Sequence, residues 1–229
     1  MNTGKIILFL VLEMRFIDLS HTIFHGLITY KGLPAPLICD FLSREKSREM
    51  YTGGTSFQIG RIDMVANTGT YMDCPFHRYD HGRDLSEIHL HEIADLPGIR
   101  INALDKKNIG TEYFEGKDVA GKAVLVYTGW SRHWNTEQYF EGHPYLTAGA
   151  AEWLKEKGAQ LVGIDSHNID DTNDGRRPVH STLLGAGILI VEHMTNLEAL
   201  PDEGFYFTSV PPKVSGMGTF PVRAFATVR

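Results

Sequence analysis

The chain has 229 residues, of which 42% are hydrophobic and 22% are charged, an ordinary balance for a globular protein that argues against a disordered chain or a coiled coil. The 28 acidic and 22 basic residues leave a formal net charge of −6, and the basic residues form no block. Nucleic-acid binding is therefore a poor hypothesis, because it usually needs a concentrated positive field. Two cysteines are too few for a disulfide framework, so we expect a cytoplasmic protein.

The first 14 residues form an N-terminal extension of uncertain status. An apolar run over residues 6–12 follows Lys5 and weakly resembles a signal-peptide core, but no small-residue cleavage site follows it and it is too short to span a bilayer. We favour an upstream start codon, with translation properly beginning at Met14, over a signal, and an extra edge strand is the other alternative. Residues 15–229 are expected to form a single domain with no membrane partner.

Strand signals dominate the rest of the chain. In chain order, apolar runs predict strands over residues 16–20, 57–66, 123–127, 161–165, 188–192, 205–207 and 222–228. The run at 57–66 has no clean polar face, so we expect it to be buried at least partly on both sides.

One helix is clear, over residues 148–157. Thr147 can cap its N-terminus, Ala150 and Leu154 share a face, and Gly158 supplies the C-terminal stop. The order strand, helix, strand across residues 123–165 is a βαβ unit and implies parallel pairing. The predicted fold class is therefore α/β, with a mixed, strand-rich sheet.

The densest polar segment directly follows the strand predicted at 57–66. It contains Asp73 and His77, four residues apart, with Pro75 fixing the backbone between them. Asp and His are ordinary ligands of divalent transition metals, and His can alternatively act as a general base. Taken alone the spacing is a weak signal, because structural turns rich in Gly, Thr, Asp and Pro look similar.

A second group of polar residues lies at the ends of the later strands. Asp165 and Glu192 each end an apolar run, and His180 lies between them. Open α/β sheets bind ligands at the carboxyl ends of their strands, and an unpaired buried carboxylate is costly. Each residue also has an ordinary alternative: Asp165 as a turn cap, the nearby Asp170 as a solvated loop charge, and His180 as a core or surface histidine. Together they favour a metal site with three N/O ligands and an open water position.

These residues belong to a wider pattern, because the chain resembles the cyclase family, the group that includes bacterial kynurenine formamidase. The family motif His-x-Gly-Thr-His-x-Asp-x-Pro-x-His aligns with Asn67 to His77, and the likeness runs from about Phe16 to the C-terminus. Other matching stretches are Asp18-Leu19-Ser20-His21, Thr128-Gly129-Trp130, Gly163-Ile164-Asp165, His180, Ile190-Val191-Glu192 and Pro221-Val222-Arg223-Ala224. The resemblance implies a swivelling β/β/α fold, a divalent metal, hydrolysis of an amide- or lactam-like bond, and a homodimer or homotetramer.

The resemblance also implies roles for single residues. Asp73, His180 and Glu192 match family metal ligands, and His77 matches the acid/base. Asn67 and Tyr71 stand where the family has histidine ligands. An amide oxygen is a poor substitute for imidazole, and a phenol with a pKa near ~10 is rarely a ligand at neutral pH. We therefore predict one divalent ion, zinc or manganese, in place of a binuclear centre.

The resulting prediction is a metal-dependent hydrolase that acts on a small amide, lactam or lactone through a metal-activated water. His77 takes or relays the proton, Tyr71 donates a hydrogen bond to a substrate oxygen, and Asn67, His21 and Asp165 contact the substrate. The alternative is a catalytically inactive or metal-free relative, serving as a small-molecule binding protein or as an isomerase or dehydratase.

Overall fold

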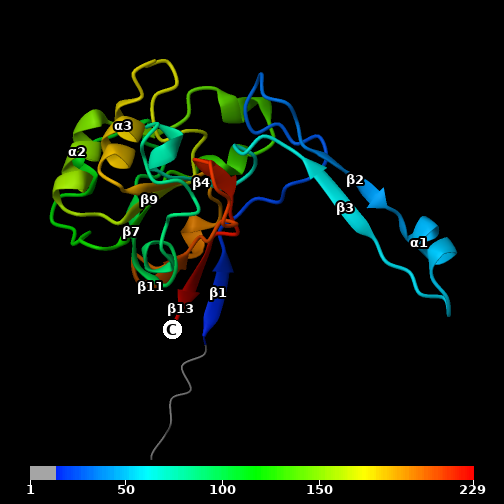
Figure 1. The fold of residues 1–229 in the computed structure, drawn as a ribbon. Helices are drawn as coiled ribbons and strands as arrows, with labels where there is room; N and C mark the ends of the chain where they lie inside the picture. The colour runs from blue at the N-terminus through cyan, green and yellow to red at the C-terminus, as the bar shows by residue number, and fades with distance from the viewer. Residues whose placement is uncertain (1–13) are drawn as a thin grey trace, which may run out of the picture.

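The body of the protein is a curled, mixed sheet of nine strands (Figure 1). This computed structural model describes residues 14–229, so the predicted N-terminal extension lies outside the described residues except for Met14. The strands are β1 (Arg15–Asp18), β4 (Tyr71–Asp73), β5 (Leu96–Asn102), β7 (Ala123–Tyr127), β9 (Leu161–Ile164), β10 (Leu189–Glu192), β11 (Glu203–Thr208), β12 (Thr219–Pro221) and β13 (Phe225–Val228). Two small sheets pair β2 (Leu37–Leu42) with β3 (Ile59–Asp63) and β6 (Asn108–Ile109) with β8 (Tyr145–Leu146).

The nine strands lie in the order β1-β13-β11-β5-β7-β9-β10-β4-β12. The four central strands, β5, β7, β9 and β10, are parallel, and the outer pairs are antiparallel. The predicted α/β class with a mixed sheet is therefore confirmed. Six short 3-10 turns, of which Pro75–His77 follows β4 directly, connect the main elements.

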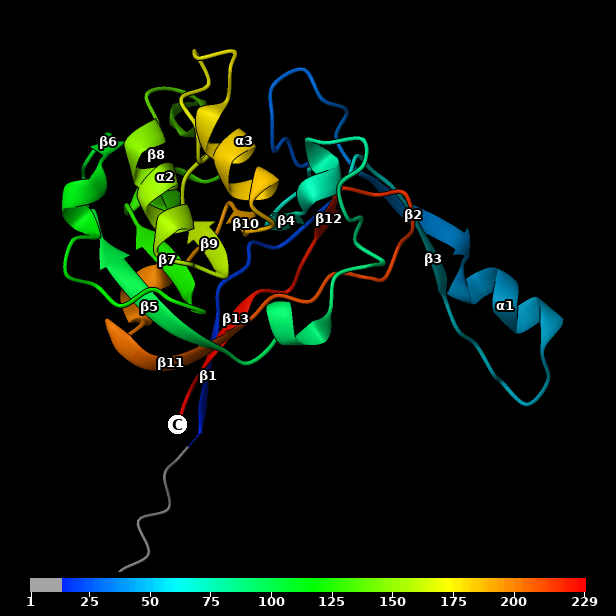
Figure 2. The ribbon, with the colours of Figure 1, turned by 60° about the vertical axis from the view of Figure 1, so that its left-hand side comes forward.

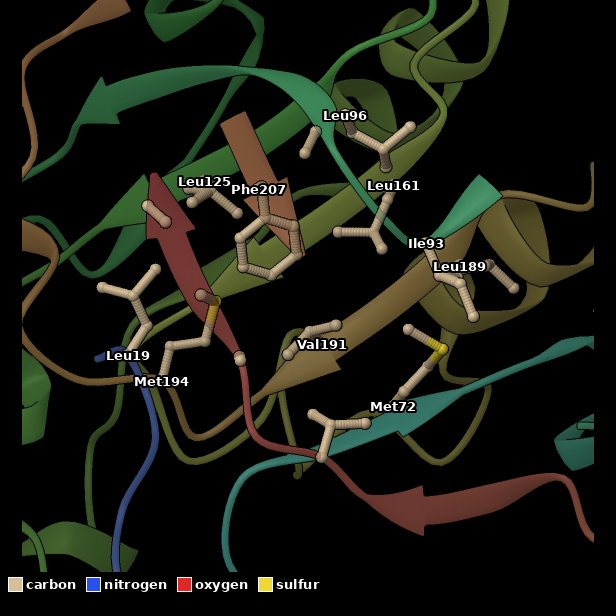
Figure 3. Close-up of a cluster of buried hydrophobic side chains, with 14 of the residues drawn as sticks. Leu19, Met72, Ile93, Leu96, Leu125, Leu161, Leu189, Val191, Met194 and Phe207 are labelled. Atoms are coloured by element: carbon tan, nitrogen blue, oxygen red, sulfur yellow. The ribbon is translucent and has the colours of Figure 1, made fainter. Parts of the chain in front are cut away.

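Two helices, α2 (Ala148–Glu156) and α3 (Pro178–Gly185), cover one face of the parallel strands (Figure 2). Alternate residues of each strand point to opposite faces, so Val124 packs under the helices while Leu125 points the other way. Leu125, Val191 and Phe207 belong to the second core, which the curled sheet encloses (Figure 3). Burial on both faces explains why the central strands read as continuous apolar runs.

The predicted βαβ unit is confirmed. Helix α2 is capped by Thr147, whose side chain accepts the N–H of Ala150 at 3.2 Å, and Gly158 follows the helix with a φ of +74°. Strands β7 and β9 on either side of it pair in parallel. None of the helices within residues 14–229 is long and apolar enough to cross a bilayer.

One segment projects away from the sheet, as both ribbon views show (Figures 1 and 2). This arm consists of β2, the helix α1 (Arg44–Met50) and β3, with β2 and β3 forming an antiparallel hairpin. The prediction that residues 57–66 are buried on both sides is wrong, because every residue of β3 is exposed. The mixed pattern reflects a strand that pairs, within residues 14–229, with β2 alone and leaves apolar residues on the surface.

Candidate metal centre

The sheet register brings acidic and phenolic side chains to one face. Glu192, the last residue of β10, pairs directly with Tyr71 on β4, and Asp73 pairs with Ile190 on β10 and with Thr219 on β12. Residues two apart on a strand share a face, so these four polar side chains converge. Tyr71, Asp73 and Glu192 are each almost completely buried.

His180 reaches the same place from the first turn of α3, held by a carboxylate behind it. Asp170 accepts the Nδ1–H of His180 at 2.6 Å, and it also accepts the backbone N–H groups of Val179 at 2.7 Å and His180 at 3.0 Å. Asp170 thus caps the helix N-terminus and fixes the imidazole tautomer. A carboxylate that holds one nitrogen of a histidine is the usual support for metal ligation by the other nitrogen.

The free nitrogen of His180 faces two carboxylates at a spacing that suits a cation. Its Nε2 lies 3.7 Å from Oδ2 of Asp73 and 3.8 Å from Oε1 of Glu192. Two ligand atoms of a tetrahedral zinc ion are separated by about 3.4 Å, given metal–ligand distances near 2.1 Å. Oδ2 of Asp73 is buried without any hydrogen-bond partner within residues 14–229. A buried carboxylate oxygen without a hydrogen-bond partner is expected of a metal ligand.

Glu192 is held by two short hydrogen bonds and by a longer one of 3.5 Å from the hydroxyl of Tyr30. Its Oε1 accepts the N–H of Ile169 and its Oε2 accepts the hydroxyl of Tyr71, both at 2.6 Å. The hydroxyl of Tyr30 lies 3.0 Å from that of Tyr71. Tyr71 therefore donates its single hydroxyl proton to a carboxylate of the candidate centre.

His77 is tied to Asp73 through a threonine hydroxyl. Thr219 Oγ1 donates to Oδ1 of Asp73 and lies 2.8 Å from Nδ1 of His77. Because a hydroxyl has one proton, Thr219 accepts from an Nδ1–H of His77, which leaves Nε2 as the basic nitrogen. The side chain of His77 is 35% exposed, so solvent and ligands can reach it.

The buried carboxylates of the centre favour the binding of a positive charge. Burial by itself would lower the pKa of His180, but the negative charge of Glu192, the hydrogen bond to Asp170 and the negative charge of Asp73 overcome this and raise it to about 10. Burial raises the pKa of Glu192 to about 7, helped by the negative charge of Asp73 and opposed by His180. A cation among these groups would replace the proton that His180 otherwise holds.

A cavity of about 260 Å³ opens onto the centre. Its lining residues are Tyr30, Leu33, Asn67, Tyr71, His77, Arg78, Asn168, Arg177, His180 and Glu192. The volume is slightly below the usual range of about 300–1,000 Å³ for small-molecule sites, which matches the expected small substrate.

The structure brings together most of the predicted site residues, namely Asn67, Tyr71, Asp73, His77, His180 and Glu192. Asp165 does not reach the cavity: it is fully buried, and it accepts the N–H and hydroxyl of Thr128 and the N–H of Gly129 at 2.6–2.8 Å. It is a structural cap, but of the turn that follows β7 and not of the turn that follows Asp165 itself, as the sequence-based alternative had it. His21 is not a lining residue either, because its ring stacks on Trp134 with centroids 4.1 Å apart.

Two supporting residues were missed by sequence reasoning. Asp170 is fully buried and holds His180, so its interpretation as a solvated loop charge is wrong. A carboxylate ten residues before the helical histidine, next to the apolar Ile169, was the available signal. Thr219 gave no signal, because only the pairing of β12 with β4 places it beside Asp73.

The comparisons with known proteins identify the family of the chain. Residues 17–171 match the family model Cyclase, described as "Putative cyclase". The chain belongs to the Cyclase family. It is 28% identical over 211 residues to kynurenine formamidase of Bacillus cereus, covering 92% of this chain and 96% of that protein, and 32% identical over 172 residues to the Geobacillus thermodenitrificans enzyme, covering 74% and 79%.

A solved structure titled "Potential Metal-Dependent Hydrolase With Cyclase Activity" superimposes with a TM-score of 0.78 at 25% identity, over 94% of this chain and 98% of that one. The expectation of an arylformamidase-like amidohydrolase is confirmed by these relatives. The cyclase-type fold is confirmed by the same superposition.

Proposed function

We propose that this Cyclase-family protein hydrolyses a small amide, lactam or lactone with one divalent ion, zinc or manganese, held by Asp73, His180 and Glu192. The observation that carries the proposal is the orphaned Oδ2 of Asp73 beside a histidine whose far nitrogen is fixed by Asp170. An ion bound here would supply Lewis-acid polarisation of a carbonyl and a lowered pKa for water.

The chain's own groups then divide the remaining work. His77, with Nδ1 directed to Thr219, offers Nε2 as the acceptor of a proton during attack and as its donor to the leaving amine. Thr219 and Asp73 keep this tautomer in place, as the second residue of a catalytic dyad does.

The role expected for Tyr71 changes in this proposal. Its hydroxyl proton is directed to Glu192, so Tyr71 orients a candidate ligand instead of donating to the substrate. Asn67 remains the neutral side chain of the cavity lining that can donate to a substrate oxygen. In this proposal, the tyrosine at a family histidine position supports a centre for one ion by holding Glu192.

The His77→Ala variant tests the division of roles. With zinc- or manganese-loaded protein and a formanilide substrate, we expect kcat to fall by about 10²–10⁴-fold while bound metal per subunit is unchanged. His81→Ala, which removes an exposed histidine from the same loop, is the matched control and should keep its activity. Nδ1 of His77 lies 3.6 Å from Oδ1 of Asp73, so loss of metal in His77→Ala would instead make His77 a ligand.

We also propose that the protein is a homo-oligomer in which the arm packs on a second copy. Phe41, Met50 and Ile62 are 73%, 67% and 58% exposed, and an isolated two-stranded hairpin is marginally stable in water. Within residues 37–63 the charges balance between Asp40, Glu45, Glu49 and Asp63 on one side and Arg44, Lys46, Arg48 and Arg61 on the other. A neutral arm avoids repulsion from a chain of net charge −6.

Light scattering after size-exclusion chromatography tests the assembly. The wild-type protein is expected to be a dimer or tetramer, and the double variant Phe41→Asp, Ile62→Asp a monomer. A monomeric wild type at micromolar concentration would contradict the assembly proposal without affecting the proposal for the metal centre.

Cys39 and Cys74 are both free thiols, which supports the proposed cytoplasmic location.

A further inference from the structure

Two arginines line the cavity of the candidate metal centre without a partner of opposite charge. Arg78 directly follows His77, and Arg177 is the residue before α3, three positions from His180. Within residues 14–229 neither guanidinium has a carboxylate oxygen within 4.0 Å. Their neighbour Arg176, by contrast, pairs with Asp174 at 2.9 Å and does not line the cavity.

Neutral contacts hold both side chains and leave part of each guanidinium free. Arg78 donates from Nε to Ser181 Oγ at 3.1 Å and from one terminal nitrogen to the carbonyl of Arg176 at 3.0 Å. One terminal nitrogen of Arg177 makes two long contacts of 3.4 Å, to Asn168 Oδ1 and to the carbonyl of Asp171. An arginine has five N–H donors in a planar fork, so each keeps donors available for a ligand.

The backbone conformation of Arg177 also indicates that this side chain has a role beyond packing. Its φ is +52°, in the left-handed region, which costs free energy for a bulky side chain and which asparagine or glycine would occupy more easily. This conformation occurs at the residue immediately before α3, and both Arg177 and His180 line the cavity.

The charge balance of the cavity favours an anion once the centre is loaded. A divalent ion and the two guanidinium groups carry four positive charges, against three from the carboxylates of Asp73, Asp170 and Glu192. One positive charge therefore remains for a ligand to neutralise.

We propose that the substrate carries a carboxylate beside its scissile amide, and that Arg78 and Arg177 bind this carboxylate while the amide lies at the metal centre. The planar guanidinium fork matches two carboxylate oxygens in geometry as well as in charge. The inference rests on the proposed amide hydrolysis for its scissile bond, but the anion site itself requires only the two arginines.

Binding of two isosteric probes to the zinc-loaded protein tests the anion site directly. Calorimetric titration with 2-aminobenzoate and with neutral 2-aminobenzamide separates charge from shape. We expect wild type to bind the carboxylate at least about tenfold more tightly. Arg78→Met and Arg177→Asn, the latter chosen because asparagine tolerates the left-handed backbone, should each weaken 2-aminobenzoate by about 10–100-fold and 2-aminobenzamide by less than about threefold.

Arg176→Met is the matched control, since it removes the same charge from the adjacent position outside the cavity, and its affinity for both probes should match wild type. Equal binding of the two probes to wild type, or no binding of either at millimolar concentration, would overturn the proposal. So would unchanged 2-aminobenzoate affinity in both arginine variants, because the carboxylate would then be held by the metal alone. Melting temperatures of all variants establish that they are folded.

Hydrolysis of N-formyl-2-aminobenzoate and N-formyl-2-aminobenzamide separates this inference from the proposed function. We expect wild type to prefer the anionic substrate, with the arginine variants losing about 10–100-fold in kcat/KM, mostly through KM. Arg177→Lys, which keeps the charge but not the fork, should recover part of this loss. If neither formamide is hydrolysed, the proposed hydrolysis fails for aryl formamides, and the anion site is still decided by the calorimetry.

Discussion

Two histidine-rich regions lie close together in this protein, and they differ in one respect. In the candidate metal centre His180 is surrounded by Glu192, Asp170 and Asp73. The negative charges of Glu192 and Asp73 and the hydrogen bond to Asp170 outweigh the effect of burial and raise its pKa to about 10. The second region, here called the imidazole cluster, consists of His21, His167 and His193 with Trp134 and Tyr139. There burial lowers the pKa of His167 to about 3 and that of His21 to about 4.

The contacts of the imidazole cluster explain this difference. His21 stacks on Trp134, and the ring centroids of His167 and His193 are 5.7 Å apart. One ring nitrogen of each histidine is buried without a hydrogen-bond partner among the described residues. Within residues 14–229 no ring nitrogen of these histidines lies within 4.0 Å of a carboxylate oxygen, whereas those of His180 do. Histidines become candidate metal ligands here only where buried carboxylates accompany them, because the carboxylates supply the charge that holds a cation.

Measuring the metal content of variants is the strongest test of the difference between the candidate metal centre and the imidazole cluster. His180→Ala is expected to lose essentially all bound zinc or manganese, a fall in affinity of about 10³-fold or more for the loss of one of three ligands. His167→Phe, which removes a buried imidazole from the other region, should keep about one equivalent per subunit. Metal analysis of protein purified without chelators or a metal-carrying tag gives the answer, and equal metal in both variants would remove the distinction.

The carboxylate behind His180 provides the next test. Asp170→Asn should weaken metal binding by about 10–100-fold, because the amide no longer supplies the charge that supports His180 as a ligand. Competition with a fluorescent zinc chelator measures the affinity. Asp171→Asn alters a partly exposed neighbour whose carboxylate accepts hydrogen bonds from Asn173 and Tyr145 and makes none with His180, and it is expected to match wild type. An unchanged metal affinity in Asp170→Asn would show that Asp170 caps the helix but does not support metal binding.

The imidazole cluster predicts acid sensitivity. Because the folded pKa of His167, about 3, lies below the unfolded value of 6.5, its contribution to stability is fully present above pH 6.5 and is lost as pH falls towards 3. The loss amounts to about 2 kcal/mol between pH 7.5 and pH 5. In His167→Phe the decrease in unfolding free energy over this range should be smaller by that amount, as urea titrations at the two pH values would show.

The smallest expected effect concerns the tyrosine between the two regions. Tyr71→Phe removes one hydrogen bond to Glu192 and should weaken metal binding by only about three- to tenfold, or about 1 kcal/mol. Turnover at saturating metal should remain within about threefold of wild type. A loss of kcat beyond about 10²-fold with metal retained would restore the role first expected from the sequence, donation to the substrate.

Much of the fold followed from patterns that are local in sequence. The apolar runs of β7 and β9, the cap at Thr147 and the stop at Gly158 are decided by neighbouring residues, so the βαβ unit could be predicted. The arm could not, because an apolar strand reads the same whether it is covered by a core or left on a projecting hairpin. Helix α3 was missed because it is only eight residues long and begins after a residue with positive φ.

The sequence by itself determined the family, the fold class and the set of polar residues from which a site could be built, because motif spacing and hydrophobic periodicity are properties of the chain. The tertiary structure decided what each polar residue does. Tyr71 lies opposite Glu192 in the sheet, and Asp170 accepts a hydrogen bond from His180. Asp165 accepts hydrogen bonds from Thr128 and Gly129. These partners are 10 to 121 residues apart along the chain, so strand register and helix packing, which join distant segments, fix their chemistry.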